Sequence, residues 1–276
     1  MRHLPILSAA GFVLLASGSS SFAISAGSLV PHRAVYDLEL KNASDRSGIT
    51  ALTGRMVYEF NGSACDGYTT TFRYVTEIDN GEQVRLTDQQ TTTYEAGDGS
   101  AFRFLTKNFV DKQLDAETIG SAALDKSSLK VDLKKPKEEK LNLAVSHFPT
   151  QHLLELLGKA EKGEKFYETS IYDGSDDANK VLATTVIIGK DGAASIGAND
   201  DEGPLKDLKS EAHWPVSMSY FSDEKSDEGL PIYQIAFQLY DNGITRDLVM
   251  DYGDFSMTGK LVDLKVFDKA PGCSPK

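Results

Sequence analysis

Apolar and polar residues alternate with a period of two along most of the chain. Successive side chains of a β-strand point to opposite faces, so this alternation predicts strands with one buried face. Residues 91–94 and 186–188 add runs rich in β-branched side chains, which favour strands. We predict roughly a dozen or more strands. The clearest alternating segments are 36–40, 52–60, 68–74, 102–104, 129–133 and 233–239.

Turn residues separate these segments and predict that neighbouring strands are antiparallel. Asn80-Gly81 and Asn242-Gly243 supply the positive-φ pairs that two-residue hairpins need, and 97–99 and 191–192 mark further reversals. In the last strand, the apolar positions change phase after Leu261. A bulge or bend near 259–262 explains this change, as does a strand whose buried face changes side.

One segment predicts a helix. Residues 149–158 carry leucines at helical spacing, with Pro149 and Thr150 as start signals and Gly158 as a stop. We expect Leu153, Leu154 and Leu157 to pack on the sheet. The charged stretches 134–140, 199–203 and 222–229 have the composition of solvated loops. Because no linker or internal repeat is evident, we predict a mainly β protein with one domain over residues 24–276.

The first 23 residues have the composition of an export signal. Arg2 and His3 form a positive start, 6–16 an apolar stretch, and 21–23 a small-residue cleavage site. A membrane anchor is the alternative, but roughly 11 apolar residues fall short of the about 20 that span a bilayer. We therefore expect the mature protein to begin near residue 24 and to be a soluble exported protein.

The chain has two cysteines, Cys65 and Cys273. Disulfides persist outside the cytosol, so the export signal makes an even number of cysteines meaningful. We predict one intramolecular disulfide between them; unpaired structural thiols and intermolecular disulfides are the alternatives. A catalytic thiol is disfavoured because there is no Cys-x-x-Cys spacing.

Net charge limits the choice of partner. The chain carries 29 Lys and Arg against 41 Asp and Glu, and loss of Arg2 leaves 28 against 41, near −13. Such a surface is repelled by nucleic acid and by anionic membranes. No apolar run after residue 23 is long enough to span a membrane.

The segments that come closest to catalytic or metal-binding motifs are better explained as structural features. Residues 192–197 lack the spacing of a G-x-S-x-G elbow, and His147 and His152 lack the i, i+4 spacing of a zinc helix. His213 beside Trp214 is typical of a packed aromatic corner. The acidic stretches 173–177 and 199–203 lack calcium-loop spacing, and there is no phosphate-binding or dinucleotide-binding fingerprint. We therefore predict no catalytic, cofactor-binding or metal-binding residues.

Eight segments are spread over nearly all of the mature chain: PHRAVYDL (31–38), GRMVYEF (54–60), CDGY (65–68), HFPTQH (147–152), FYETSIYDG (166–174), WPV (214–216), YDNG (240–243) and PGC (271–273). Together they resemble the envelope integrity protein B family of alphaproteobacteria. The resemblance implies a periplasmic β-spiral, in which antiparallel strands curl around a central helix, with Cys65 and Cys273 bridged. The family name refers to the integrity of the cell envelope and to no reaction.

Three functional hypotheses follow. The first is a non-enzymatic protein that maintains the cell envelope by binding a periplasmic protein or another envelope component. The second is a carrier of lipid or lipoprotein, because a curled sheet around a helix can shelter an acyl chain. The third is a hydrolase of an envelope polymer, which the absence of motifs disfavours.

Overall fold

The computed structural model describes residues 29–175, 177–192, 202–206, 212–221 and 229–268, and its fourteen strands form one sheet. The strands are β1 (His32–Ala43), β2 (Ala51–Ser63), β3 (Gly67–Asp79), β4 (Val84–Glu95), β5 (Ala101–Val110), β6 (Gln113–Leu124), β7 (Leu129–Lys135), β8 (Glu139–Leu143), β9 (Phe166–Ile171), β10 (Leu182–Ile188), β11 (His213–Phe221), β12 (Tyr233–Tyr240), β13 (Thr245–Asp251) and β14 (Phe255–Val266). The helices are η1 (Asp45–Ser47), α1 (Pro149–Glu161) and α2 (Glu202–Leu205).

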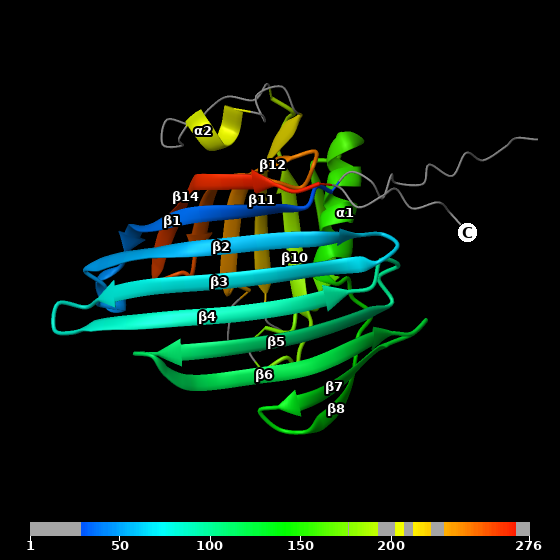
Figure 1. The fold of residues 1–276 in the computed structure, drawn as a ribbon, viewed down its shortest axis with the longest axis horizontal. Helices are drawn as coiled ribbons and strands as arrows, with labels where there is room; N and C mark the ends of the chain where they lie inside the picture. Colours follow the sequence, from blue (N-terminus) through cyan, green and yellow to red (C-terminus); the bar gives the residue numbers. More distant parts are fainter. Residues whose placement is uncertain (1–28, 176, 193–201, 207–211, 222–228, 269–276) are drawn as a thin grey trace, which may run out of the picture.

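The sheet consists of two antiparallel meanders joined side by side. Its strand order is β8-β7-β6-β5-β4-β3-β2-β1-β14-β13-β12-β11-β10-β9, so the first and last strands of the chain pair at its centre. The middle of the chain, including α1, connects the two outermost strands. Figure 1 shows β2 and β3 crossing in front of α1 and β10–β12, so the sheet curls around the helix. The mainly β fold around a short helix is therefore confirmed.

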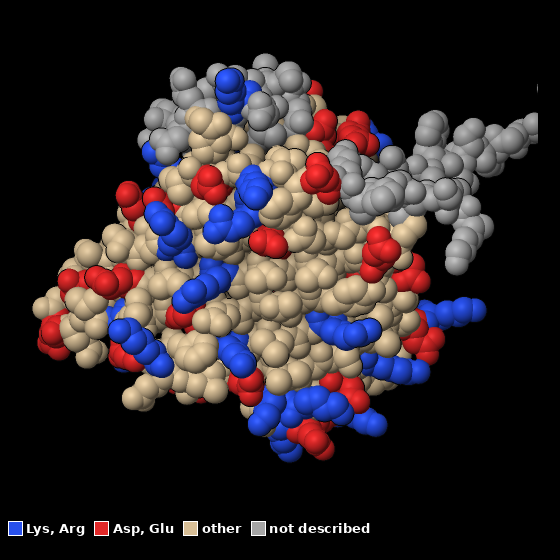
Figure 2. All heavy atoms as spheres, viewed as in Figure 1, with Lys and Arg blue, Asp and Glu red and all other residues tan. Residues whose placement is uncertain are grey.

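The main core lies between the two meanders and includes one face of α1. Leu154, Leu156 and Leu157 are buried together with side chains of β1, β2 and β10–β14. A smaller, aromatic core lies under β5–β7, where Phe102 stacks on Phe148 with ring centroids 5.1 Å apart. The outer face is charged: Arg55 pairs with Asp37 and Arg73 with Asp88 across neighbouring strands. Figure 2 shows both signs of charge interspersed over this face.

The helix is longer than predicted, and its buried face differs. It continues past Gly158, which is buried against the core, and ends just before Gly163, whose φ of 77° suits a glycine. Leu156 is buried, whereas Leu153 is only partly buried. The prediction that the helix ends at Gly158 was wrong. A glycine on the buried face of a helix can pack against the core without ending the helix.

Two turn predictions and one loop prediction also need correction. The chain reverses at Asn80-Gly81 and Asn242-Gly243, but each loop is longer than two residues, and only the glycine has positive φ. The asparagine side chains accept hydrogen bonds from the backbone instead, Asn80 from Gln83 and Asn242 from Ile244. The stretch 134–140, predicted as a loop, forms the end of β7, a turn and the start of β8.

The predicted irregularity in the last strand is a bulge. The pairing of β1 with β14 skips Val262, because Val35 pairs with Asp263 while Tyr36 pairs with Leu261. Most of 199–203 and 222–229 lies outside the described residues. None of the helices in the described part of the chain is long and apolar enough to cross a bilayer.

Candidate ligand-binding cavity

Beside α1, the curled sheet lines a cavity of about 460 Å³ that is partly open to solvent. We call it the main cavity. Its walls come from β2–β5 on one side, from the first turns of α1 on another, and from β9, β11 and β12 with the loop after β9. Its size lies within the range of about 300–1,000 Å³ that is typical of small-molecule sites. A second cavity of about 150 Å³ shares Phe72 and Gln89 with it and so adjoins it.

The strand β4 gives the main cavity a polar wall. Its Gln89, Thr91 and Thr93 line the cavity, and Glu95, two residues further on, is buried behind it. Thr70 of β3 and Thr106 of β5 extend this surface, which we call the β4 wall. Thr91 and Thr106 have their hydroxyl oxygens 3.1 Å apart and share a hydrogen bond. Alternation of apolar and polar residues predicts that polar side chains lie on the outer face of the sheet. The sequence analysis therefore did not predict this polar wall.

The helix and the second meander contribute apolar side chains to the main cavity. It is lined by Leu153 and Leu156 of α1, by Met218 of β11, and by Phe237 of β12. The cavity is therefore amphipathic, with hydroxyl and amide groups facing aliphatic and aromatic side chains.

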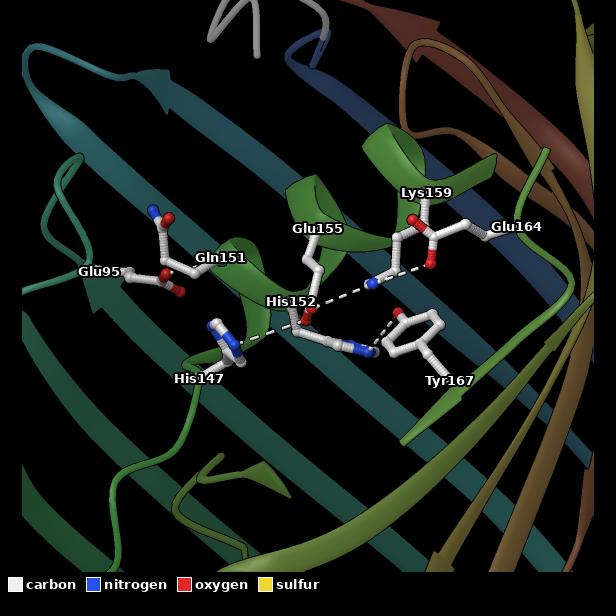
Figure 3. Close-up of polar contacts among 8 residues, drawn as sticks. All are labelled: Glu95, His147, Gln151, His152, Glu155, Lys159, Glu164 and Tyr167. Atoms are coloured by element: carbon white, nitrogen blue, oxygen red, sulfur yellow. Dashed lines mark hydrogen bonds and ion pairs between the residues drawn. The ribbon is translucent and has the colours of Figure 1, made fainter. Parts of the chain in front are cut away.

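Glu95 fixes the helix beside the β4 wall. Its carboxylate oxygens accept hydrogen bonds from the backbone N–H groups of Thr150 and Gln151, at 2.8 and 2.9 Å. No side chain next to the helix caps it, and Pro149 has no N–H to satisfy. Figure 3 shows this carboxylate at the start of α1. Burial raises the pKa of Glu95, and the two N–H donors oppose that shift.

His152 forms a neutral hydrogen-bonding pair with Tyr167 at the cavity. The two side chains approach to 3.1 Å between Nε2 and the phenol oxygen, and His152 is 5% exposed. Burial, assisted by the nearby His147, lowers the pKa of His152 to about 4. Burial likewise raises the pKa of Tyr167. Both side chains are therefore uncharged at neutral pH.

His147 and His152 do not converge on one site. Figure 3 shows His147 directed toward Glu155, whereas His152 turns toward Tyr167. Lys159 of α1 and Glu164, just after the helix, continue the polar row that Glu155 begins. Across the described residues, no group of three or more His, Cys, Asp or Glu side chains is arranged to hold a metal ion.

Tyrosines from the two meanders surround the second cavity, and no sequence motif pointed to them. Tyr74 of β3 faces Tyr233 and Tyr252 there. Tyr233 packs between Tyr220 and Tyr252, with ring centroids 5.6 and 4.9 Å apart. This row of rings connects the two cavities, because Tyr233 and Tyr252 line the second cavity and Tyr220 lines the main cavity.

The other residues singled out from sequence lie elsewhere. His213 is buried and stacks on Tyr240 with ring centroids 5.3 Å apart, as expected for an aromatic corner. Asp173 lines the main cavity, whereas 193–197 of the elbow-like segment lie outside the described residues. Cys65 is exposed in the turn between β2 and β3 and is not a free thiol. Cys273 lies outside the described residues, so its pairing stays a prediction.

Comparison with known proteins identifies the family. A family model described as EipB-like matches residues 23–268. A curated protein of Brucella abortus (strain 2308), "Cell envelope integrity protein EipB", is 52% identical over 282 residues, which cover 99% of this chain and 100% of the relative. A crystal structure described as a β-barrel-like protein of a domain of unknown function, DUF1849, from Brucella abortus, superposes with a TM-score of 0.83 at 56% identity, covering 87% of this chain and 99% of that one. The chain belongs to the EipB-like family.

Proposed function

We propose that this protein maintains the integrity of the cell envelope without catalysing a reaction, by binding an envelope component in the periplasm. The observation that carries the proposal is the 52% identity, over 99% of the chain, to a protein named for envelope integrity. The cavity supports a binding role, because the polar groups of its β4 wall are neutral hydroxyls and an amide.

The proposal includes export, and with it a mature domain of residues 24–276 and a Cys65–Cys273 disulfide. The family match begins at residue 23, next to the predicted cleavage site. The strand register supports the disulfide, because Val266 and Phe60 both pair with His32. The chain thus leaves β14 two strands, roughly 10 Å, from β2 and at the end where Cys65 lies. Thiol labelling of the denatured, unreduced protein tests the bridge: no label is expected, and two labelled thiols would contradict it.

A deletion strain tests the function. We expect loss of the protein to sensitise cells to detergents, bile salts and wall-directed antibiotics, but not to cytosolic stresses. The full-length chain should restore resistance, and a chain lacking residues 1–23 should not, because it stays in the cytosol. Normal resistance of the deletion strain, or rescue by the chain without its signal, would overturn the proposal.

His152 tests the non-enzymatic part of the proposal. His152→Gln keeps a hydrogen-bonding group at the cavity but removes the imidazole. If the protein acts by binding, rescue should persist when the variant's abundance and fold are normal. Loss of rescue under those conditions would favour a catalytic role, for which hydrolysis of an envelope polymer is the first reaction to assay.

A carrier of lipid or lipoprotein is the second candidate, and the amphipathic cavity favours it. A cavity of about 460 Å³, with apolar side chains from α1, β11 and β12, offers an acyl chain a partly sheltered surface on which to pack. Native mass spectrometry of protein purified from its own periplasm separates the candidates: a bound lipid supports the carrier, and a bound protein supports partner docking.

A further inference from the structure

We propose that the main cavity holds one acyl chain of an uncharged acylglycerol lipid. The glycerol and ester oxygens of this lipid lie against the β4 wall. The inference deepens the carrier candidate above and rests on it. The chain packs on the side formed by Leu153, Leu156 and Phe237.

The polar composition of the β4 wall is the first argument. Four consecutive inward positions of β4, at 89, 91, 93 and 95, are polar, although β4 lies well inside the sheet. Glu95 has a structural role as the helix cap. Apart from the hydrogen bond between Thr91 and Thr106, no hydrogen bond of the side chains of Gln89, Thr91 and Thr93 is described. Polar residues that break the local pattern are expected at functional sites.

The charge of the lining is the second argument. None of the described residues that line the main cavity is Lys or Arg, and its one carboxylate is Asp173. The buried Glu95 adds a second carboxyl group next to the main cavity. A phosphate or carboxylate head group would lose its hydration here and gain no cation. Threonine hydroxyls and the Gln89 amide can instead donate hydrogen bonds to ester and hydroxyl oxygens.

The shape of the space is the third argument. The second cavity adjoins the main one at Phe72 and Gln89 and extends it between Tyr74 and Tyr233. An extended chain fits two joined cavities better than a rigid, compact ligand does. Its methylene groups gain affinity by leaving water, by about fourfold for each one buried.

Calorimetric titration of the full mature protein tests the head-group selectivity. The probes are monomyristoylglycerol, myristate and lyso-phosphatidylglycerol with a myristoyl chain, each below its critical micelle concentration. We expect the uncharged probe to bind at least tenfold more tightly than either anion. Equal or tighter binding of an anion, or no binding of the uncharged probe, would overturn the inference.

Two variants on neighbouring positions of β4 locate the ligand. Thr91→Phe fills the main cavity and should weaken lipid binding more than tenfold. Thr92→Phe places the same side chain on the exposed outer face and should leave lipid binding unchanged. A third variant, Thr91→Val with Thr106→Val, keeps the shape of the cavity and removes two hydroxyls. It should weaken binding by about three- to tenfold. Unchanged binding in either cavity variant, at normal thermal stability, would place the lipid elsewhere.

An acylglycerol group also occurs on protein, so the source is tested separately. A lipopeptide whose first cysteine bears the same acylglycerol distinguishes the two. Tighter binding of the lipopeptide assigns the ligand to lipoproteins, and equal binding assigns it to free glycerides; both support the inference. If no lipid binds while the chain still rescues the deletion strain, this inference fails and the envelope role stands.

Discussion

β1 and β4 lie three places apart in one sheet and present different chemistry to its interior. The inward residues of β1 include Ala34, Tyr36 and Leu38, each at most 2% exposed and packed in the main core. Those of β4 include Thr91 and Thr93, which are only partly buried and line the main cavity. Both strands form antiparallel ladders with both of their neighbours, and bulges interrupt only the ladder between β1 and β14.

This difference shows that the interactions that form the sheet are distinct from the side chains that fill its interior. Backbone hydrogen bonds hold both strands in place whatever their side chains. Packing then divides the interior into a region that α1 and β1 fill and a region that the β4 wall leaves open. We expect stability to depend on the first region and binding on the second.

Alanine substitutions on the two strands give the largest predicted contrast. Leu38→Ala removes a side chain that is 1% exposed and should lower the free energy of unfolding by about 2–5 kcal/mol. Thr91→Ala loses one shared hydrogen bond at a cavity and should cost about 1 kcal/mol or less. Denaturant unfolding measures both. Similar losses would show that the β4 wall is part of the stabilising core.

His152, at the border between the two regions, predicts a dependence of stability on pH. Its pKa is about 4 in the folded protein, against 6.5 for an ordinary histidine, so only the unfolded chain takes up this proton between those values. Stability should therefore be fully present above pH 6.5 and fall by about 3 kcal/mol as the pH drops to 4.

The variant His152→Gln isolates this effect. Glu95, whose raised pKa acts in the opposite direction as the pH changes, is present in both proteins and cancels in the comparison. The difference in unfolding free energy between wild type and variant should shrink as the pH falls from 6.5 to 4. A difference that is constant over this range would contradict the buried, neutral imidazole.

Glu95 gives a smaller effect. Glu95→Ala leaves the N–H groups of Thr150 and Gln151 without their acceptor and should cost about 1–2 kcal/mol. Asp88→Ala on the outer face of the same strand is the control. Its ion pair with the exposed Arg73 should contribute at most about 1 kcal/mol. Thermal and denaturant unfolding measure both variants. If Glu95→Ala and Asp88→Ala lower the stability equally, the role of Glu95 as the helix cap is contradicted.

Much of the fold, but little of the cavity, follows from the sequence. Alternation identified strands such as β2 and β3, and leucine spacing identified α1, because each pattern reflects a local period. The phase change after Leu261 located the bulge. The cap from Glu95 was not predictable, because it joins residues 55 positions apart that only the curled sheet brings together. The inward direction of Thr91 was equally hidden, since β4 is polar on both faces.

Rescue of the deletion strain by Thr91→Phe and by Thr92→Phe, at matched periplasmic abundance, tests the central claim most directly. The claim is that the open region beside the β4 wall, and not the outer surface of that strand, carries the function. We predict that Thr92→Phe restores resistance to detergent and bile salts as well as the wild type does, whereas Thr91→Phe does not. Full rescue by Thr91→Phe would contradict the account.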